Sequence, residues 1–199
     1  MTGTHNRELG LKDRFNDGII ACLGIEQKDY YSKITNSQML GLKTLLSDVN
    51  NIITLKIASR LAERICQTLN LDCDTKHSIE NIIRTTKPNA NGYDIECPAP
   101  LIIAECKCNI PINKGDKFGS AQKTSLEKDI KGLLYGKSKS KIQFKDAMKF
   151  LGLLDEPKIR QAVDSYLKNR MEFKGRLIIE PNQGLVLDVN HVYIIYVKL

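Results

Sequence analysis

Helical spacing of apolar side chains dominates the first half of the chain. Three segments have apolar residues at intervals of three or four, which places those residues on one face of a helix; they cover residues 9–23, 37–49 and 52–69. Ser37 is suited to cap the second of these helices, and Ser78 to cap a shorter helix over residues 78–84. The turn-forming segment 87–92 then ends this predicted helical part.

The pattern becomes strand-like after residue 92. Residues 93–97 alternate between apolar and polar, residues 101–108 begin with an apolar β-branched run, and Pro98-Ala99-Pro100 separates them, which predicts a β-hairpin. Further helices are expected over residues 120–135, 144–154 and 157–168, and further strands over 176–180, 184–188 and 191–199. This order predicts an α+β (α/β) protein with a mixed central sheet flanked by helices. We expect a single domain with a helical N-terminal part, 1–75, and a core, 76–199.

Composition narrows the class of protein. The chain is 42% hydrophobic and 27% charged, as in ordinary globular proteins, and it has no apolar run long enough to span a membrane. The polar N-terminus has no secretory signal, so a cytoplasmic location with reduced cysteines is expected. Cys106 and Cys108 form a C-x-C pair that raises the alternative of zinc. A second ligand pair is not visible, which favours small buried hydrophobic residues.

The positive charge is concentrated in one stretch. Residues 107–149 contain eleven lysines and four acids, an excess of seven that equals the net charge of +7 of the whole chain. A basic block of this kind is suited to bind a polyanion such as a nucleic acid. A solvated lysine-rich face is the alternative interpretation.

Three ionisable residues cluster around the predicted hairpin. Asp94 lies in its first strand, and Glu105 and Lys107 lie near the end of its second strand. Residues two apart in a strand share a face, so Glu105 and Lys107 point to one side and Cys106 to the other. The apolar start of the strand indicates a core position, where buried charges are costly unless they are paired or bound to metal. The hairpin brings Asp94 alongside Glu105.

Phosphodiester hydrolysis requires this combination of groups. Two carboxylates hold a hard divalent cation such as Mg²⁺, which prefers oxygen ligands. The metal polarises the scissile phosphate and lowers the pKa of a bound water. A lysine orients or deprotonates that water and offsets phosphate charge. The backbone carbonyl of Cys106 is placed to be a further oxygen ligand.

These residues resemble a known pattern. Gly92-Tyr93-Asp94-Ile95, with ten residues between Asp94 and Glu105 and then Glu105-Cys106-Lys107, is similar to the PD-(D/E)xK nuclease superfamily, and most like its type II restriction endonucleases. The resemblance covers the hairpin closely and the helix after it loosely. Tyr93 stands where the pattern has proline, a position that varies across the superfamily.

The resemblance implies a restriction-endonuclease-like core, a substrate and a cofactor. It implies sequence-specific cleavage of double-stranded DNA by a homodimer in a bacterial or archaeal cytoplasm, with Mg²⁺ as cofactor and Mn²⁺ as a substitute. Asp94 and Glu105 are then the metal ligands and Lys107 is the catalytic lysine. In this superfamily the helix after the motif faces the DNA backbone. The resemblance therefore implies that the candidates for phosphate contact are Lys117, Gln122 and Lys123.

Several residues and functions remain as alternatives. Glu80, on the helix before the hairpin, is a candidate supporting carboxylate, although a solvated helix residue is the simpler interpretation. Glu96 replaces Asp94 as a ligand if the hairpin register differs. A structure-specific nuclease, such as a Holliday junction resolvase or repair enzyme, keeps the same site with another substrate. A non-catalytic nucleic-acid-binding module explains the lysines without metal chemistry. A G-x-x-x-x-G-K-[ST] loop is missing, which argues against nucleotide hydrolysis.

Overall fold

The computed structural model describes residues 6–86, 92–111, 115–140, 142–181 and 186–199. The chain forms two compact units, Met1–Val49 and Asn50–Leu199. Among the described residues, no helix combines the length and the apolar character that crossing a bilayer requires.

The first unit contains helix α1 (Arg7–Leu23) and the start of helix α2 (Asn36–Thr68). Asn6 caps α1, because its side-chain oxygen accepts the N–H of Leu9 at 3.1 Å. The predicted cap of α2 at Ser37 is wrong. Thr35 Oγ1 accepts the N–H of Gln38 at 3.2 Å and Gln38 Oε1 accepts the N–H of Thr35 at 2.9 Å, so this reciprocal pair starts the helix earlier.

The helices predicted over 37–49 and 52–69 are one continuous helix, α2. Asn50 and Asn51 lie between the two predicted segments. Asparagine lowers helix propensity only modestly and keeps its backbone N–H, unlike proline, so the helix continues through these residues.

The second unit is built on a five-stranded mixed sheet, which agrees with the predicted fold class. Its strands are β1 (Ile95–Pro98), β2 (Leu101–Lys107), β3 (Met148–Leu154), β4 (Leu177–Ile179) and β5 (Val192–Val197). The order in the sheet is β1-β2-β3-β5-β4. β1 is antiparallel to β2, and the other pairs are parallel.

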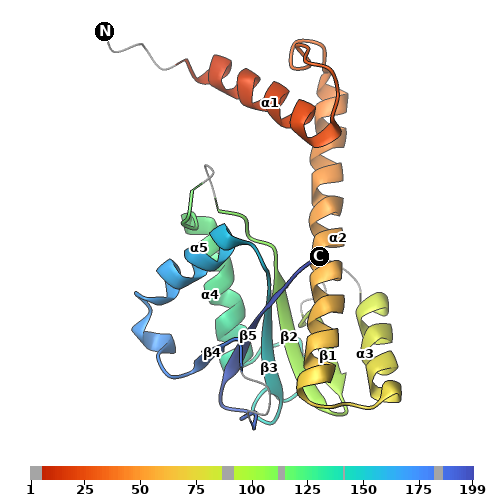
Figure 1. Cartoon of the computed structure of the whole chain (residues 1–199), viewed down its shortest axis with the longest axis vertical. Helices are drawn as coiled ribbons and strands as arrows, with labels where there is room; N and C mark the ends of the chain where they lie inside the picture. The colour runs from red at the N-terminus through yellow and green to blue at the C-terminus, as the bar shows by residue number, and fades with distance from the viewer. Residues whose placement is uncertain (1–5, 87–91, 112–114, 141, 182–185) are drawn as a thin grey trace. The chain divides into compact units, whose positions relative to one another are not determined.

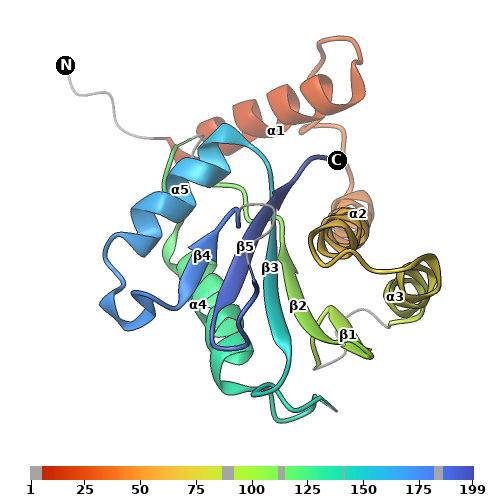
Figure 2. The ribbon, with the colours of Figure 1, turned by 60° about the horizontal axis from the view of Figure 1, so that its bottom comes forward.

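Helices cover both faces of this sheet. Besides the second half of α2, they are α3 (Cys73–Thr85), α4 (Ser120–Tyr135), α5 (Pro157–Leu167) and the short 3-10 helix η2 (Met171–Phe173). α4 and α5 pack on the face that carries Ile103 and Leu151. α2 and α3 pack on the opposite face, with Ile102 and Phe150 (Figures 1 and 2). Two apolar layers therefore hold the sheet between helices.

The predicted helix over 144–154 is wrong, because Met148–Leu154 forms the central strand β3. This strand lies between two parallel neighbours and is buried on both faces, so its apolar residues run almost continuously and imitate a buried helix. Gly152 fits the close approach of α2, since a Cβ there would lie 2.9 Å from Leu61 Cδ2. Lys149 is buried, and its ammonium donates to the carbonyls of Ala147 and Val189.

Two other predicted elements, a helix and a strand, also differ from the structure. α3 begins at Cys73 rather than near Ser78, because Asp72 Oδ1 accepts the N–H of Thr75 at 2.7 Å and caps the helix there. The strand predicted over 184–188 falls partly outside the described residues, and residues 186–188 are not in a strand.

Packing of α2 on the sheet yields a stability prediction. Leu61 is fully buried, so Leu61→Ala is expected to lower the free energy of unfolding by about 2–5 kcal/mol through lost burial and a cavity. Leu55 on the same helix is 46% exposed, so Leu55→Ala is the matched control and is expected to cost less than about 1 kcal/mol. Urea denaturation measures both, and equal losses would contradict the observed orientation of α2.

Candidate active site

A cleft of about 1450 Å³ opens on the second unit beside the end of β2. It is lined by residues of α2 and α3, the β1–β2 hairpin, α4 and the loop after α4. Among these residues are five lysines, at positions 107, 128, 131, 137 and 139, and four acids, at positions 94, 105, 127 and 129. The cleft therefore combines carboxylates with a comparable number of cations.

Asp94 reaches the cleft from the residue before β1, rather than from within the strand as predicted. The hairpin pairs Ile95 with Ala104, so Asp94 lies one residue beyond this pair, on the side of Glu105. Its Oδ2 atom accepts the backbone N–H of Cys106 at 2.7 Å. Burial raises the pKa of Asp94, while this hydrogen bond and two nearby lysines oppose the shift.

Glu105 lies at the cleft end of β2 and is only 4% exposed. Its neighbours Ala104 and Cys106 pack on the α2 face of the sheet, so Glu105 lies on the α4 face, as strand alternation predicts. Burial raises the pKa of Glu105 to about 8, with contributions from Asp94 and Asp129. Its Oε1 atom forms an ion pair with Lys137 Nζ, which opposes that rise.

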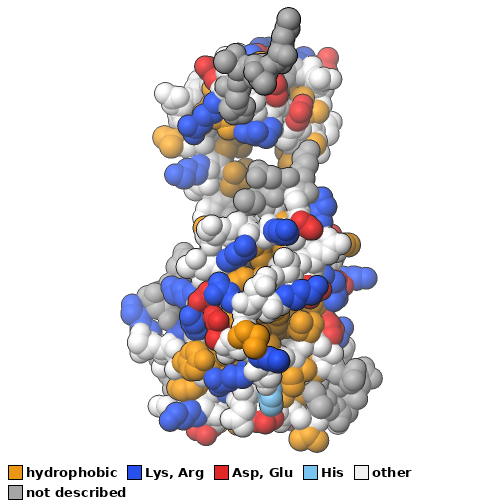
Figure 3. Space-filling view, turned by 90° about the vertical axis from the view of Figure 1, so that its left-hand side faces the viewer, with side chains coloured by type: hydrophobic (Ala, Val, Ile, Leu, Met, Phe, Trp, Pro, Cys, Tyr) orange, Lys and Arg blue, Asp and Glu red, His pale blue; other side chains and the backbone are white. Residues whose placement is uncertain are grey.

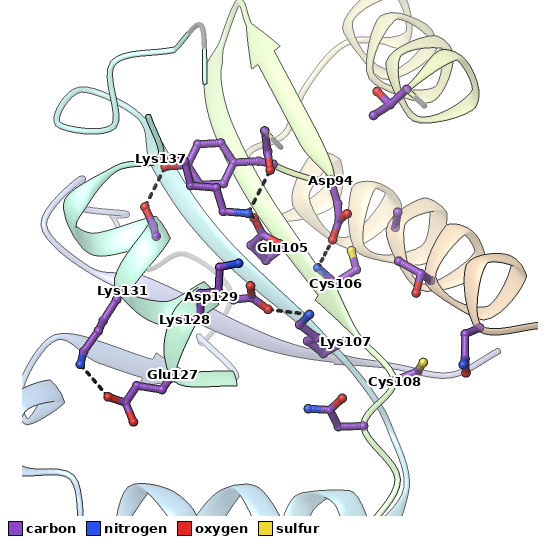
Figure 4. Close-up of a pocket in the computed structure, with 18 of the residues that line it drawn as sticks. Asp94, Glu105, Cys106, Lys107, Cys108, Glu127, Lys128, Asp129, Lys131 and Lys137 are labelled. Atoms are coloured by element: carbon purple, nitrogen blue, oxygen red, sulfur yellow. Dashed lines mark hydrogen bonds and ion pairs between the residues drawn. The ribbon is translucent and has the colours of Figure 1, made fainter. Parts of the chain in front are cut away.

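Lys107 follows on the same face and is anchored by Asp129 of α4. Lys107 Nζ lies 2.9 Å from Asp129 Oδ2 (Figure 4). Burial by itself lowers the pKa of Lys107, but Asp129, Glu105 and Asp94 together outweigh it, so the pKa is raised and the ammonium keeps its proton. The structure thus brings together the three residues predicted from the hairpin.

Asp129 and Lys137 are parts of the cluster that the sequence analysis missed. Asp129 is 6% exposed and stands within the apolar stripe formed by Leu126, Ile130 and Leu133 of α4. An acid inside such a stripe was the available signal, because a buried carboxylate needs a partner. Lys137 lies in a lysine-rich loop, where the sequence does not distinguish it from its neighbours.

Of the predicted supporting and DNA-contact residues, only Gln122 lines the cleft. Those outside the cleft lining are Glu80, Glu96, Lys117 and Lys123. The Glu96 side chain turns back, and its Oε1 atom accepts the N–H of Tyr93 at 3.0 Å. Gln122 lines the cleft, but its side chain accepts the N–H of Gly119 at 3.0 Å and donates to the carbonyl of Ile110, so it organises the start of α4.

The two thiols of the C-x-C pair belong to the core on the α2 face, with Cys106 buried and Cys108 packed against that core. Within the described part of the chain, no group of three or more His, Cys, Asp or Glu side chains is arranged to hold a metal. Of the four acids that line the cleft, the hairpin contributes two, Asp94 and Glu105, and these form a smaller candidate donor set. Burial is the main cause of the raised pKa of Glu105, and the nearby carboxylate of Asp94 adds to it; a divalent cation would offset that negative charge. The donor chemistry therefore fits an oxygen-preferring ion.

Comparisons with protein-family models, curated proteins and solved structures found no match to this chain.

The anchoring of Lys107 can be tested directly. Asp129→Asn is expected to lower the pKa of Lys107, because burial then acts on the ammonium with one fewer negative neighbour. NMR titration of the Lys107 side chain measures this pKa. Glu127→Gln is the matched control, since the Glu127 carboxylate on the same helix pairs with Lys131 and Arg170 instead. An unchanged pKa in Asp129→Asn would contradict the proposed electrostatic role of Asp129.

Proposed function

We propose that this protein is a metal-dependent nuclease. The observation that supports the proposal is the convergence of Asp94, Glu105 and Lys107 on one cleft from the two arms of a hairpin. Two carboxylates and a lysine beside an open, lysine-bearing cleft are the groups that phosphodiester hydrolysis needs. The resemblance of these residues to the PD-(D/E)xK pattern supports the same conclusion.

The roles of the residues follow from their positions. Asp94 and Glu105 would hold the divalent cation, with the Cys106 carbonyl as a proposed third ligand. When bound, Mg²⁺ would polarise the scissile phosphate and lower the pKa of a water. Lys107 is held protonated by its acidic neighbours, so it binds and orients a phosphate oxygen or the attacking water by donating hydrogen bonds. Asp129 is a positioning residue for Lys107.

The particular activity we propose is cleavage of double-stranded DNA at a specific sequence, as in a type II restriction enzyme. Lysines on the cleft offer contacts to phosphates. On the face seen in Figure 3, lysine and arginine side chains are mixed with acidic and apolar ones, so this face is not uniformly cationic. Two copies acting as a homodimer would allow both strands of a palindromic site to be cut.

Substitution of the three central residues tests the catalytic role. Asp94→Asn, Glu105→Gln and Lys107→Met are each expected to reduce Mg²⁺-dependent cleavage of plasmid DNA by about a hundredfold or more, because each removes a metal ligand or a phosphate contact. Chelation of metal is expected to abolish cleavage by the unmodified protein. Circular dichroism establishes that each variant is folded.

Glu96→Gln is the matched control in the same hairpin, since Glu96 does not line the cleft, and it is expected to retain activity. Full cleavage by all three central variants would refute the proposal. Discrete plasmid fragments would support sequence specificity. Cleavage confined to branched DNA would favour a structure-specific nuclease, and salt-sensitive binding without cleavage under Mg²⁺ or Mn²⁺ would favour a binding module.

Lys128 provides a test of DNA contact in the cleft. It lines the cleft, is exposed, and forms no ion pair with any other described residue. Lys128→Gln is expected to weaken DNA binding and to reduce the slope of log affinity against log salt by about one, because one phosphate contact is lost. Lys56→Gln, at an exposed position of α2 that does not line the cleft, is the control. Equal slopes for both variants would place the DNA elsewhere.

A further inference from the structure

Lys137 is held against the acidic cluster by three contacts, although it comes from the loop after α4. Its Nζ atom forms an ion pair with Glu105 Oε1 and donates to the carbonyl of Gly92 at 2.9 Å. The same atom lies 5.1 Å from the centre of the Tyr93 ring, within cation–π range. Lys137 therefore contacts both arms of the hairpin, just before Asp94 and at Glu105 itself.

The surrounding backbone leaves room for this side chain. A Cβ at Gly132 would lie 3.0 Å from Lys137 Cε, so the absence of a side chain there lets the lysine run along α4. The Tyr93 hydroxyl donates to the carbonyl of Gly132 at 2.8 Å. This hydrogen bond fixes the Tyr93 ring, which the Lys137 ammonium contacts, to the turn of α4 that contains Gly132. Gly136 has a φ of +94°, which favours glycine, and directs the chain into Lys137. Lys137 thus occupies a built slot rather than a solvated loop position.

The charges of the cluster indicate what Lys137 does there. Glu105 is almost fully buried and lies near two other carboxylates, those of Asp94 and Asp129. Lys107 is paired with Asp129, so among the side chains that the structure describes it is Lys137 that forms an ion pair with Glu105. A buried carboxylate requires such a partner. A divalent cation held by Glu105 would take over the same role with a larger charge.

We propose that Lys137 is the resident cation of this site, which neutralises Glu105 in the metal-free protein and competes with a divalent cation for the Glu105 carboxylate. The competition rests on the proposed metal-dependent function, whereas the neutralisation does not. A site of this kind keeps its buried acids paired before metal arrives, and the strength of the Lys137 contact sets the metal affinity.

Calorimetric titration with Mg²⁺ alone, without DNA, tests the competition. Lys137→Met is expected to bind Mg²⁺ roughly fivefold more tightly than the unmodified protein, the effect of losing one partly buried ion pair. Burial raises the pKa of Glu105 to about 8, and removal of Lys137 strengthens its proton binding further. The titration is therefore run near about pH 9 in two buffers of different ionisation enthalpy, which counts any proton that Mg²⁺ displaces from the carboxylate.

Lys139→Met is the matched control for this titration. Lys139 lies in the same loop and lines the same cleft, but it is exposed and has no ion pair with a described residue. It therefore reports the general loss of one positive charge, and its Mg²⁺ affinity is expected to stay close to that of the unmodified protein. Equal Mg²⁺ affinities for Lys137→Met and the unmodified protein would overturn the competition and leave the nuclease proposal standing. The absence of Mg²⁺ binding in every form would overturn both.

A second measurement tests the neutralisation without any metal. Lys137→Met is introduced into two proteins, the unmodified protein and the Glu105→Gln variant, and the Tm of each is measured with chelator at the same pH. The decrease in Tm is expected to be larger in the unmodified protein, because in the Glu105→Gln variant no carboxylate is left unpaired. Equal decreases in the two backgrounds would overturn the proposal, whatever the metal titration shows.

Discussion

The site depends on one physical constraint, the burial of a carboxylate at the end of a core strand. Glu105 follows a run of apolar residues that packs between two helical layers, so its backbone position is fixed by the core and its charge is withdrawn from water. Such a charge must find partners. Lys137 contacts it directly, and Asp94 and Asp129 lie close enough to raise its pKa. The other charged groups of the cleft are arranged around this requirement.

The hairpin and the helix after it place the other charged groups of the cleft around Glu105. The short turn between β1 and β2 places Asp94 beside the end of β2, where its carboxylate accepts the Cys106 N–H and is held in place. α4 returns across the same face of the sheet and contributes Asp129, which fixes Lys107. The proposed nuclease activity needs acids and a lysine in a fixed relation, and the packing of these three elements holds the side chains in place.

Two of the predicted elements differ from the structure for separate physical reasons. β3 was mistaken for a helix because a strand buried on both faces loses its alternation, and the parallel neighbours that bury it lie far away in the sequence. The two helices predicted over 37–49 and 52–69 are a different case, because α2 runs without interruption through the two asparagines between them. In contrast, α4 was predicted with its observed bounds, since its ends depend on local signals.

The sequence by itself determined the hairpin, its two-residue alternation and the convergence of Asp94, Glu105 and Lys107, because these follow from local spacing and a short turn. Only the tertiary structure decided which other residues join them. Asp129 and Lys137 are more than twenty residues from Glu105 along the chain, and α4 with its following loop brings them back to it. Glu96 has the right chemistry and position in the hairpin but turns to the Tyr93 N–H. Local pattern specifies which side chains share a strand face, whereas partners across layers depend on how the helices pack.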